Sequence, residues 1–320
     1  MLHPASRILN PTTVYDGDAE DPMAEIKDFA GVARAPFLLL PLTLVASGAA
    51  AAAWDGHFSW LHTMLALVGL VVLHMAVNIL NEWSDMRTGI DLETDRTPFS
   101  GGSGTLPSGG MGSQTALIFG LACAAIGLGI GIWFVPRIGT ALIPIMIVGG
   151  VCVLAYTDAL ARMGIGEIAA GFGLGAGPVI GTALVQDGSW SRAAIAASIP
   201  AFLMTFNLLL LNEVPDQQAD RKGGRQNLVI LLGRRSAALV YAAAAIATPI
   251  SIAIAVVIGW LPSLALIGTL PSLLLFKPLQ WAVGNTDQPV PIPALGANVV
   301  WNLATNSLIA VGLVAAVMMR

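Results

Sequence analysis

Two short stretches of the chain carry the same order of polar side chains. Residues 80–85 (LNEWSD) and residues 211–216 (LNEVPD) share the pattern Leu-Asn-Glu-x-x-Asp, and each is followed by an Asp-Arg pair, Asp95-Arg96 after the first and Asp220-Arg221 after the second. Side chains four residues apart lie on one face of a helix, so the amide and the carboxylate of each stretch would share a face. Two acidic faces that met at one cavity would repel strongly unless cations lay between them.

The repeated stretches have the side chains of a magnesium site. Carboxylate, amide and water oxygens are ligands of Mg²⁺, and Mg²⁺ held by few carboxylates completes its shell with water and substrate phosphate. A single copy would be weak evidence, because acidic residues are common at the water-facing ends of helices. Two copies, separated by a long apolar part of the chain, predict a metal site formed by two related halves of the protein.

The rest of the sequence is strongly apolar. Of 320 residues, 56% are hydrophobic and 11% are charged, against about 25% charged in an average soluble domain. The mean hydropathy is +0.77. This composition excludes a soluble globular enzyme and a disordered chain, and the net charge of −4 argues against nucleic acid as a partner. His57, His62 and His74 lack the spacing of metal ligands and are interpreted as structural.

The apolar residues occur in blocks of spanning length, since a helix needs about 20 of them to cross a bilayer. The expected fold is all-α: a polytopic membrane protein with about nine transmembrane helices in two related halves around a central cavity. The expected helices are 36–53, 61–81, 113–134, 138–156, 167–185, 193–211, 236–259, 261–282 and 294–319.

The basic residues predict the orientation of these helices. With the N-terminus on the cytoplasmic side, every Lys and Arg except Arg137, Arg192 and Arg320 lies inside, as the positive-inside rule requires. The sequence therefore predicts a protein of the inner or plasma membrane with its N-terminus inside, its C-terminus outside and its acidic motifs facing the cytoplasm. The acidic residues also concentrate inside, which the rule does not require, so their position points to function.

The expected organisation is a cytoplasmic segment over residues 1–35 and a single transmembrane domain over 36–320. Residues 23–34 fit either a short amphipathic helix at the membrane interface or an ordinary polar lead-in. The inside loops 82–112 and 212–235 are long and polar, and they carry nearly all the candidate chemistry.

The two motifs resemble those of the UbiA-type intramembrane prenyltransferases. Asn81-x-x-x-Asp85 and Asp216-x-x-x-Asp220 match the pattern of that family, but the third acidic position, Asp91, follows Asp85 by six residues instead of four. That longer form resembles the branch of 1,4-dihydroxy-2-naphthoate prenyltransferases of menaquinone synthesis. Segments such as Arg34-Ala-Pro36 and Tyr156-Thr157 are similar to the family as well, and the resemblance runs from about residue 30 to residue 235.

The resemblance implies an activity and a set of ligands. A polyprenyl diphosphate would bind through two Mg²⁺ ions, ionise to an allylic cation and alkylate an electron-rich aromatic acceptor, with the lipid bilayer receiving the long isoprenoid tail. The implied metal ligands are Asn81, Asp85 and Asp91 for one ion, and Asp216 and Asp220 with Asn212 as a helper for the other.

Further polar residues are implied around the diphosphate. Asp95 would hydrogen-bond a ligand water or a basic residue, and Tyr156 is interpreted either as a group that orients the diphosphate or acceptor, or as an interfacial aromatic. Lys222 and Arg225 fit phosphate binding and fit ordinary inner-surface charge equally well. The candidates for binding the diphosphate are Arg162, Lys222, Arg225, Tyr156 and Asn78.

Two other functions remain open from the sequence. A relative within the same superfamily would use a different acceptor, or would cyclise the isoprenoid without one. A cation transporter from another class would also have repeated halves and acidic clusters, but transporters place their ion site near the bilayer midplane, whereas these acidic residues lie at the inner ends of helices.

Overall fold

The computed structural model describes residues 24–320, and in that part of the chain every regular element is helical. Eight helical segments are long and apolar enough to cross a membrane, which confirms the predicted all-α polytopic fold and makes the chain an integral membrane protein. The segments are Ala35–Trp54, Trp60–Thr88, Ser113–Ile138, Gly166–Asp187, Arg192–Lys222, Arg234–Val257, Ser263–Val283 and Ile292–Met318.

The fourth of the nine expected helices, 138–156, is shorter than predicted. It covers Thr140–Leu154 as a 3-10 turn, η2 (Thr140–Leu142), followed by α6 (Ile143–Leu154). The polar residues Thr157 and Asp158 follow soon after, and the chain turns at Ala155. The remaining helices bear out the predicted order, with α2 (Leu39–Trp54), α5 (Ser113–Ile138), α11 (Arg234–Val257), η5 (Ser263–Leu275), α12 (Phe276–Val283) and α13 (Ile292–Met318).

The two helices that carry the motifs extend further than predicted. α3 (Trp60–Thr88) and α9 (Arg192–Lys222) continue well into the segments that the sequence suggested were loops, 82–112 and 212–235. Asn81 and Asp85 therefore lie on a helix, as do Asp216 and Asp220. The short helices α4 (Ile90–Glu93) and α10 (Leu228–Leu232) follow these ends, and α4 packs against α9.

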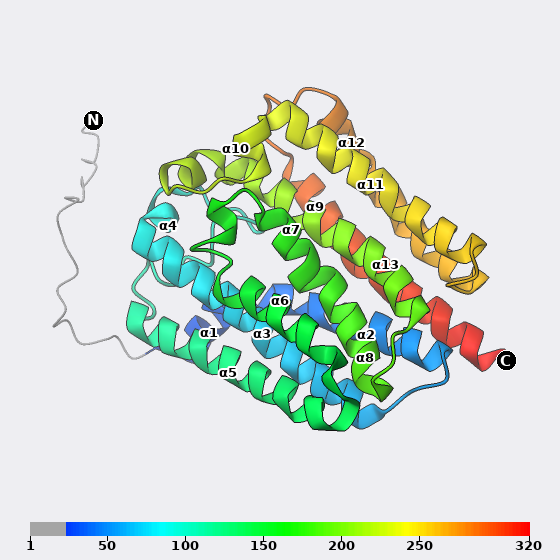
Figure 1. Ribbon diagram of the computed structural model, residues 1–320. Coiled ribbons are helices and arrows are strands. Elements are labelled where there is room, and N and C mark those ends of the chain that lie inside the picture. The colour runs from blue at the N-terminus through cyan, green and yellow to red at the C-terminus, as the bar shows by residue number, and fades with distance from the viewer. Residues whose placement is uncertain (1–23) are drawn as a thin grey trace, which may run out of the picture.

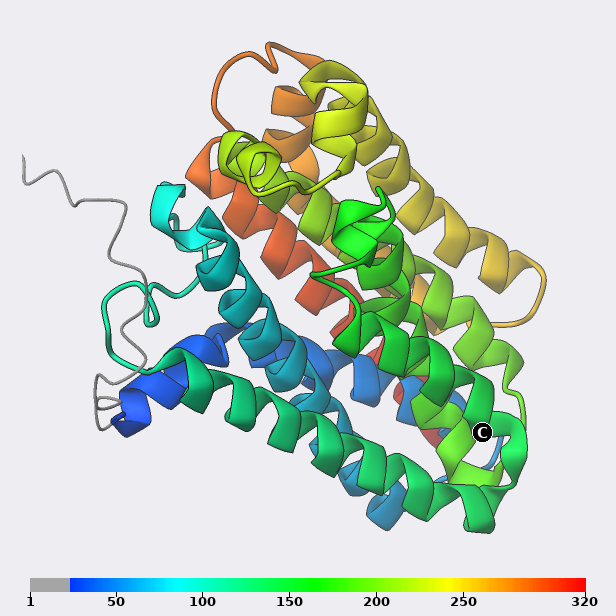
Figure 2. The same ribbon diagram turned by 60° about the vertical axis from the view of Figure 1, so that its left-hand side comes forward.

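The motif-bearing ends of α3 and α9 lie together at one end of the bundle. α4 and α10 mark that end, and the C-terminus lies at the opposite end (Figure 1). The turned view also shows the end of α3 beside α10 (Figure 2). Before the first span, α1 (Ile26–Val32) and the 3-10 turn η1 (Ala35–Leu38) pack against α3. α1 confirms a short helix within 23–34, and its position relative to the membrane interface stays a prediction.

The span Gly166–Asp187 is interrupted beside the centre of the bundle. It consists of α7 (Gly166–Gly171), a wide turn η4 (Phe172–Ala176) and α8 (Gly177–Asp187), and Leu174 departs from helical geometry with φ −119°. Pro178 has no N–H to donate to the Leu174 carbonyl one turn earlier. The Thr205 hydroxyl of α9 donates to that carbonyl at 3.0 Å instead, so the kink is stabilised by a neighbouring helix.

Close helix packing holds this arrangement, and the contact of α2 with α8 is one example. A Cβ atom on Gly48 of α2 would lie 2.4 Å from the Val179 carbonyl oxygen, whereas a Cβ on Gly149 of α6 would meet nothing within 4 Å.

Gly48→Ala should therefore lower the midpoint of thermal unfolding in detergent, because overpacking costs about 1–3 kcal/mol. Gly149→Ala should leave the midpoint unchanged or raise it. Equal midpoints for the two variants would contradict this packing.

Candidate active site

Carboxylates from both copies of the repeat meet at a single guanidinium. Arg225 Nη2 lies 2.5 and 2.7 Å from the two carboxylate oxygens of Asp85, and its Nη1 lies 3.2 Å from Asp220 Oδ1. All three side chains are largely buried. Burial disfavours the charge of Arg225, but Asp85 and Asp220 outweigh that effect and raise its pKa, so the guanidinium stays protonated. The structure thus brings together residues 140 positions apart.

The six-residue spacing between Asp85 and Asp91 has a local cause. α3 ends at Gly89, which adopts a left-handed conformation with φ 82° and reverses the chain into α4. The reversal places the Asp91 side chain back against the site, where it is buried. The longer spacing is therefore what a helix end followed by a turn requires, in contrast to the four-residue spacing of the continuous helix α9.

Asp91 lies in the site without an ion pair to any described residue. Its carboxylate packs against Gly102, and its Oδ2 atom has no hydrogen-bond partner among the described residues. Arg96 donates to the Asp91 backbone carbonyl at 3.1 Å instead of to the side chain. Burial, with the neighbouring Asp85 and Glu82 adding to it, raises the pKa of Asp91 to about 7. A bound cation would favour the ionised carboxylate and reverse this shift.

The second motif has similar unpaired oxygens. Asp216 Oδ2 accepts a hydrogen bond from the Gly101 backbone N–H at 3.1 Å, while its Oδ1 and the Asn212 Oδ1 are buried without partners in the described part of the chain. Asp220 is held by Arg225 and by the Asn227 amide at 2.9 Å. Unpaired buried oxygens are costly, and they are the donor type that Mg²⁺ binds.

This donor set fits a hard cation, although the ligands are not gathered as a finished cage. Among residues 24–320 no three His, Cys, Asp or Glu side chains lie close enough together to hold an ion, and Arg225 lies between Asp85 and Asp220. Binding of an ion between the two motifs would therefore require these side chains to turn and Arg225 to give up part of its contact.

The loop between α4 and α5, residues 94–112, lies across the acidic side chains. Glu82, fully buried beside Asn81, accepts hydrogen bonds from the Ser103 N–H at 2.7 Å and from the Ser103 hydroxyl at 2.5 Å. The same loop supplies the Gly101 N–H to Asp216. Glu82 therefore fastens the loop over the site, and its carboxylate is already satisfied, so it is not a free ligand.

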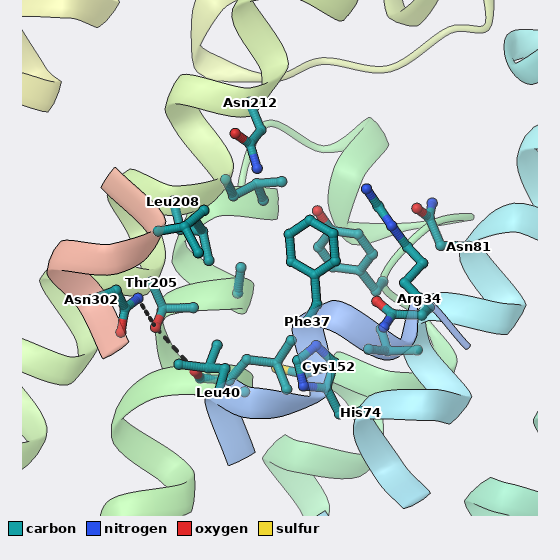
Figure 3. Close-up of a pocket in the computed structure, with 18 of the residues that line it drawn as sticks. Arg34, Phe37, Leu40, His74, Asn81, Cys152, Thr205, Leu208, Asn212 and Asn302 are labelled. Carbon is teal, nitrogen blue, oxygen red and sulfur yellow. Dashed lines mark hydrogen bonds between the residues drawn. The ribbon is translucent and has the colours of Figure 1, made fainter. Parts of the chain in front are cut away.

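The cavity beside this cluster has a volume of about 160 Å³. Figure 3 shows Arg34 and Asn81 on one side of it, Thr205 and Asn302 on the other, and Phe37 between them. Most of the wall is apolar, with polar groups at its edges. Such a space suits a ligand with a flat apolar body and a few polar substituents.

Of the predicted diphosphate ligands, two line the cavity and Arg162 lies outside its wall. Asn78 and Tyr156 line the cavity, and Asn78 also donates to the Ala33 carbonyl at 3.0 Å. Burial, followed by the nearby Glu213, raises the pKa of Tyr156 well above its usual value, so its hydroxyl stays a hydrogen-bond donor. Arg162 lies against Gly224, in the loop that carries Arg225, and makes no ion pair or hydrogen bond with a described residue.

Two predicted residues lie away from this centre. Lys222 is exposed and pairs with Glu93. Asp95 is exposed and forms no hydrogen bond or ion pair within residues 24–320. The structure therefore brings Asn78, Asn81, Asp85, Asp91, Asn212, Asp216, Asp220, Tyr156 and Arg225 to the cavity and its mouth, with Arg162 nearby, and does not bring Lys222 or Asp95 there.

Sequence reasoning missed several residues that shape the site. Arg34 lines the cavity and is the only non-glycine residue of the described chain with positive φ, at 52°, a strained conformation typical of functional positions. The sequence signal for Arg34 was its position in the segment Arg34-Ala-Pro36, directly before the first span. Glu167 and Glu213 are both buried inside the bundle, and Glu167 accepts the Leu228 N–H at 2.6 Å. They lie beside the loop that carries Arg225, and spacing alone gave no sign of this.

Comparison with known proteins agrees with the fold. The profile of the UbiA prenyltransferase family matches residues 39–303, so the chain belongs to this family and is a prenyltransferase. A Bacillus subtilis protein named 1,4-dihydroxy-2-naphthoate octaprenyltransferase is 27% identical over 75% of this chain and 77% of its own length. An Escherichia coli protein of the same name is 26% identical over 86% of this chain and 91% of its own.

Two solved structures share the fold. A UbiA homolog from Aeropyrum pernix K1, in its apo form, has a TM-score of 0.67 at 18% identity, covering 87% of this chain and 97% of its own. A UbiA homolog from Archaeoglobus fulgidus, bound to DMAPP and Mg²⁺, has a TM-score of 0.65 at 16% identity, covering 92% of this chain and all of its own.

Removal of the bridging charge should destabilise the metal-free protein. Arg225→Gln leaves two buried carboxylates unpaired, which costs about 3–5 kcal/mol, so the unfolding midpoint in EDTA should fall. Mg²⁺ should raise the midpoint of this variant more than that of the wild type, because the ion replaces the lost charge. Lys222→Gln removes only an exposed pair worth about 1 kcal/mol or less and is the matched control. An Arg225→Gln midpoint equal to the control in EDTA would contradict the bridge.

Proposed function

We propose that this prenyltransferase transfers a polyprenyl group from a polyprenyl diphosphate to an aromatic acceptor, 1,4-dihydroxy-2-naphthoate, in a Mg²⁺-dependent reaction. The observation that carries the proposal is the meeting of two acidic helix ends at the mouth of an apolar cavity. A diphosphate with its metal ions fits the acidic mouth, and the apolar and aromatic parts of the two substrates fit the space beside it.

Two Mg²⁺ ions are proposed, one for each motif. Asn81, Asp85 and Asp91 would hold one, and Asp216 and Asp220, assisted by Asn212, the other; the unpartnered oxygens of Asp91, Asp216 and Asn212 support this assignment. When bound, the ions would neutralise the diphosphate and stabilise it as a leaving group. The related structures determined with GPP and Mg²⁺ and with DMAPP and Mg²⁺ support a metal-bound diphosphate in this fold.

Basic and polar residues of the chain would bind the diphosphate and the acceptor and orient them for reaction. Arg225 and Arg162 lie where they can bind diphosphate oxygens, and Arg225 becomes available as the carboxylates turn toward metal. Tyr156 and Asn78 line the adjacent wall and can donate hydrogen bonds to the diphosphate or to the acceptor. Cleavage of the allylic carbon–oxygen bond would leave an allylic cation, which the apolar wall shields from water until the aromatic ring captures it.

The acceptor assignment rests on chemistry and on the relatives. The relatives from Bacillus subtilis and Escherichia coli are named for 1,4-dihydroxy-2-naphthoate. In this chain Phe37 and Phe99 offer aromatic surface in the cavity, and Arg34 offers a cation to an acceptor carboxylate. Arg34 is held over the Phe37 ring at 4.7 Å and donates to the Phe99 carbonyl at 3.4 Å, so its position is fixed before the acceptor binds.

The cytoplasmic face of the cell or plasma membrane is the proposed location of the site. The excess of basic residues at the motif-bearing end supports this orientation. The cation-transporter alternative is less well supported, because the acidic side chains lie at the ends of α3 and α9 and not at the middle of a span.

Turnover by the purified full chain tests the proposal. Protein with Mg²⁺ and geranylgeranyl diphosphate is mixed with 1,4-dihydroxy-2-naphthoate, with 4-hydroxybenzoate or with no acceptor, and the products are identified by mass spectrometry. The expected product is a prenylated naphthoquinol that has lost its carboxylate, formed only with Mg²⁺. Diphosphate release without an acceptor would indicate a cyclase, and a product only from 4-hydroxybenzoate would indicate a different acceptor class.

Asp216→Asn should abolish this turnover while the protein remains folded, because one metal loses a charged ligand. A loss of about 10³-fold is expected, at the upper end of the range seen when one group that stabilises developing charge is removed. Asp55→Asn, at the opposite end of the bundle on an exposed turn, is the matched control and should turn over normally. An Asp216→Asn enzyme with full activity would rule out the two-metal assignment.

A further inference from the structure

His74 is a buried polar side chain that faces the cavity without a partner. It lies on α3 and lines the cavity. The residue is 4% exposed, and its Nδ1 atom has no hydrogen-bond partner among the described residues. A buried polar group without a partner costs stability. Its presence on a cavity wall therefore points to a ligand that supplies the missing hydrogen bond.

The position of His74 relative to the motif fits the second substrate. Positions 74, 78, 81 and 85 repeat at four, three and four residues, so His74 lies on the same face of α3 as Asn81 and Asp85. Seven residues separate it from Asn81, which is about 10 Å along the helix axis. His74 is therefore too far from the acidic mouth to bind the diphosphate and lies at the depth where an aromatic acceptor would reach.

The surroundings of His74 leave it free to act on a ligand. Figure 3 shows its ring beside Leu40 and Cys152 at the base of the cavity, with Arg34 and Phe37 above. Arg34 is the charged residue that lines the same cavity, and none of the described carboxylates pairs with His74. An imidazole in such an environment offers one nitrogen as an acceptor for a hydroxyl proton.

We propose that His74 is a catalytic residue that binds a ring hydroxyl of the aromatic acceptor and takes its proton while the carbon–carbon bond forms. This inference rests on the proposed aromatic acceptor. Phenolic oxygen donates electron density to the ring most strongly when it loses its proton, so a base at this position activates the ring carbon at the moment the allylic carbon is attacked.

The proton and electron pairs balance in this step. The carbon–oxygen bond of the prenyl diphosphate breaks, and its electron pair leaves with the diphosphate. The ring carbon that bears the carboxylate then bonds to the allylic carbon, while the hydroxyl proton passes to His74 and its oxygen becomes a ketone. Loss of the carboxylate as CO₂ returns an electron pair to that oxygen, which takes the proton back from His74 and restores the aromatic ring.

The chain provides a matched control on the same helix. His62 also has a buried Nδ1 without a partner among the described residues, but its ring makes edge-to-face contacts with Trp133 and Phe134 and does not line the cavity. We compare His74→Leu, His74→Gln and His62→Leu in the full chain. Size-exclusion profile and unfolding midpoint establish that each variant is folded, and the smaller change to Gln serves if the Leu variant does not fold.

The test measures kcat and KM with 1,4-dihydroxy-2-naphthoate and with its fully methylated ethers, in which neither ring oxygen carries a proton. His74→Leu and His74→Gln should lower kcat for the free hydroxyl compound by about 10²-fold or more, the range of general-base catalysis. Binding of an unreactive thio-diphosphate analogue with Mg²⁺ should be unchanged, and His62→Leu should behave as wild type. The wild type should strongly prefer the hydroxyl compound to its ethers, whereas the His74 variants should have lost that preference.

Two failures are distinguishable. If the wild type prenylates the naphthoate but the His74 variants match His62→Leu in kcat and keep the preference for the free hydroxyl, the role of His74 is overturned and the proposed function stands. If the wild type prenylates no hydroxylated aromatic acceptor while still releasing diphosphate, both the acceptor assignment and the role of His74 are overturned.

Discussion

The structure depends on one electrostatic constraint, the convergence of buried carboxylates from two distant helix ends. Like charges at such short range would drive α3 and α9 apart unless a positive charge lay between them. In this structure Arg225 supplies that charge through contacts to Asp85 and Asp220. The proposed Mg²⁺ ions would supply it during catalysis, so a single requirement for a countercharge links the stability of the bundle to substrate binding.

Several packing features serve this convergence. Gly89 ends α3 and returns Asp91 to the site, and Glu82 fastens the loop that reaches Asp216. Behind the site, Glu167 accepts the N–H of Leu228, the first residue of α10, beside the chain segment that carries Arg225. These contacts join elements that are far apart in the sequence, so the site and the fold are formed together.

The sequence was sufficient for the fold class and for much of the candidate site, because long apolar blocks and repeated Asn-x-x-x-Asp spacing are local patterns. The positive-inside rule predicted that the two helix ends with the acidic motifs lie on the same side of the membrane. The sequence could not reveal that Arg225 bridges Asp85 and Asp220, nor that Lys222, three residues earlier, points to Glu93 instead. His74 was interpreted as structural because only the tertiary structure shows the cavity that it faces.

The central claim is that the Asp85–Asp91 and Asp216–Asp220 carboxylates hold metal ions that bind the diphosphate. The most direct test is a structure of the protein with Mn²⁺ and an unreactive polyprenyl thio-diphosphate, in which anomalous scattering locates the metal. We expect two Mn²⁺ peaks, one at each motif, both in contact with the diphosphate, and Arg225 moved away from Asp85. A diphosphate bound without metal between the motifs, or Mn²⁺ bound only elsewhere, would contradict it.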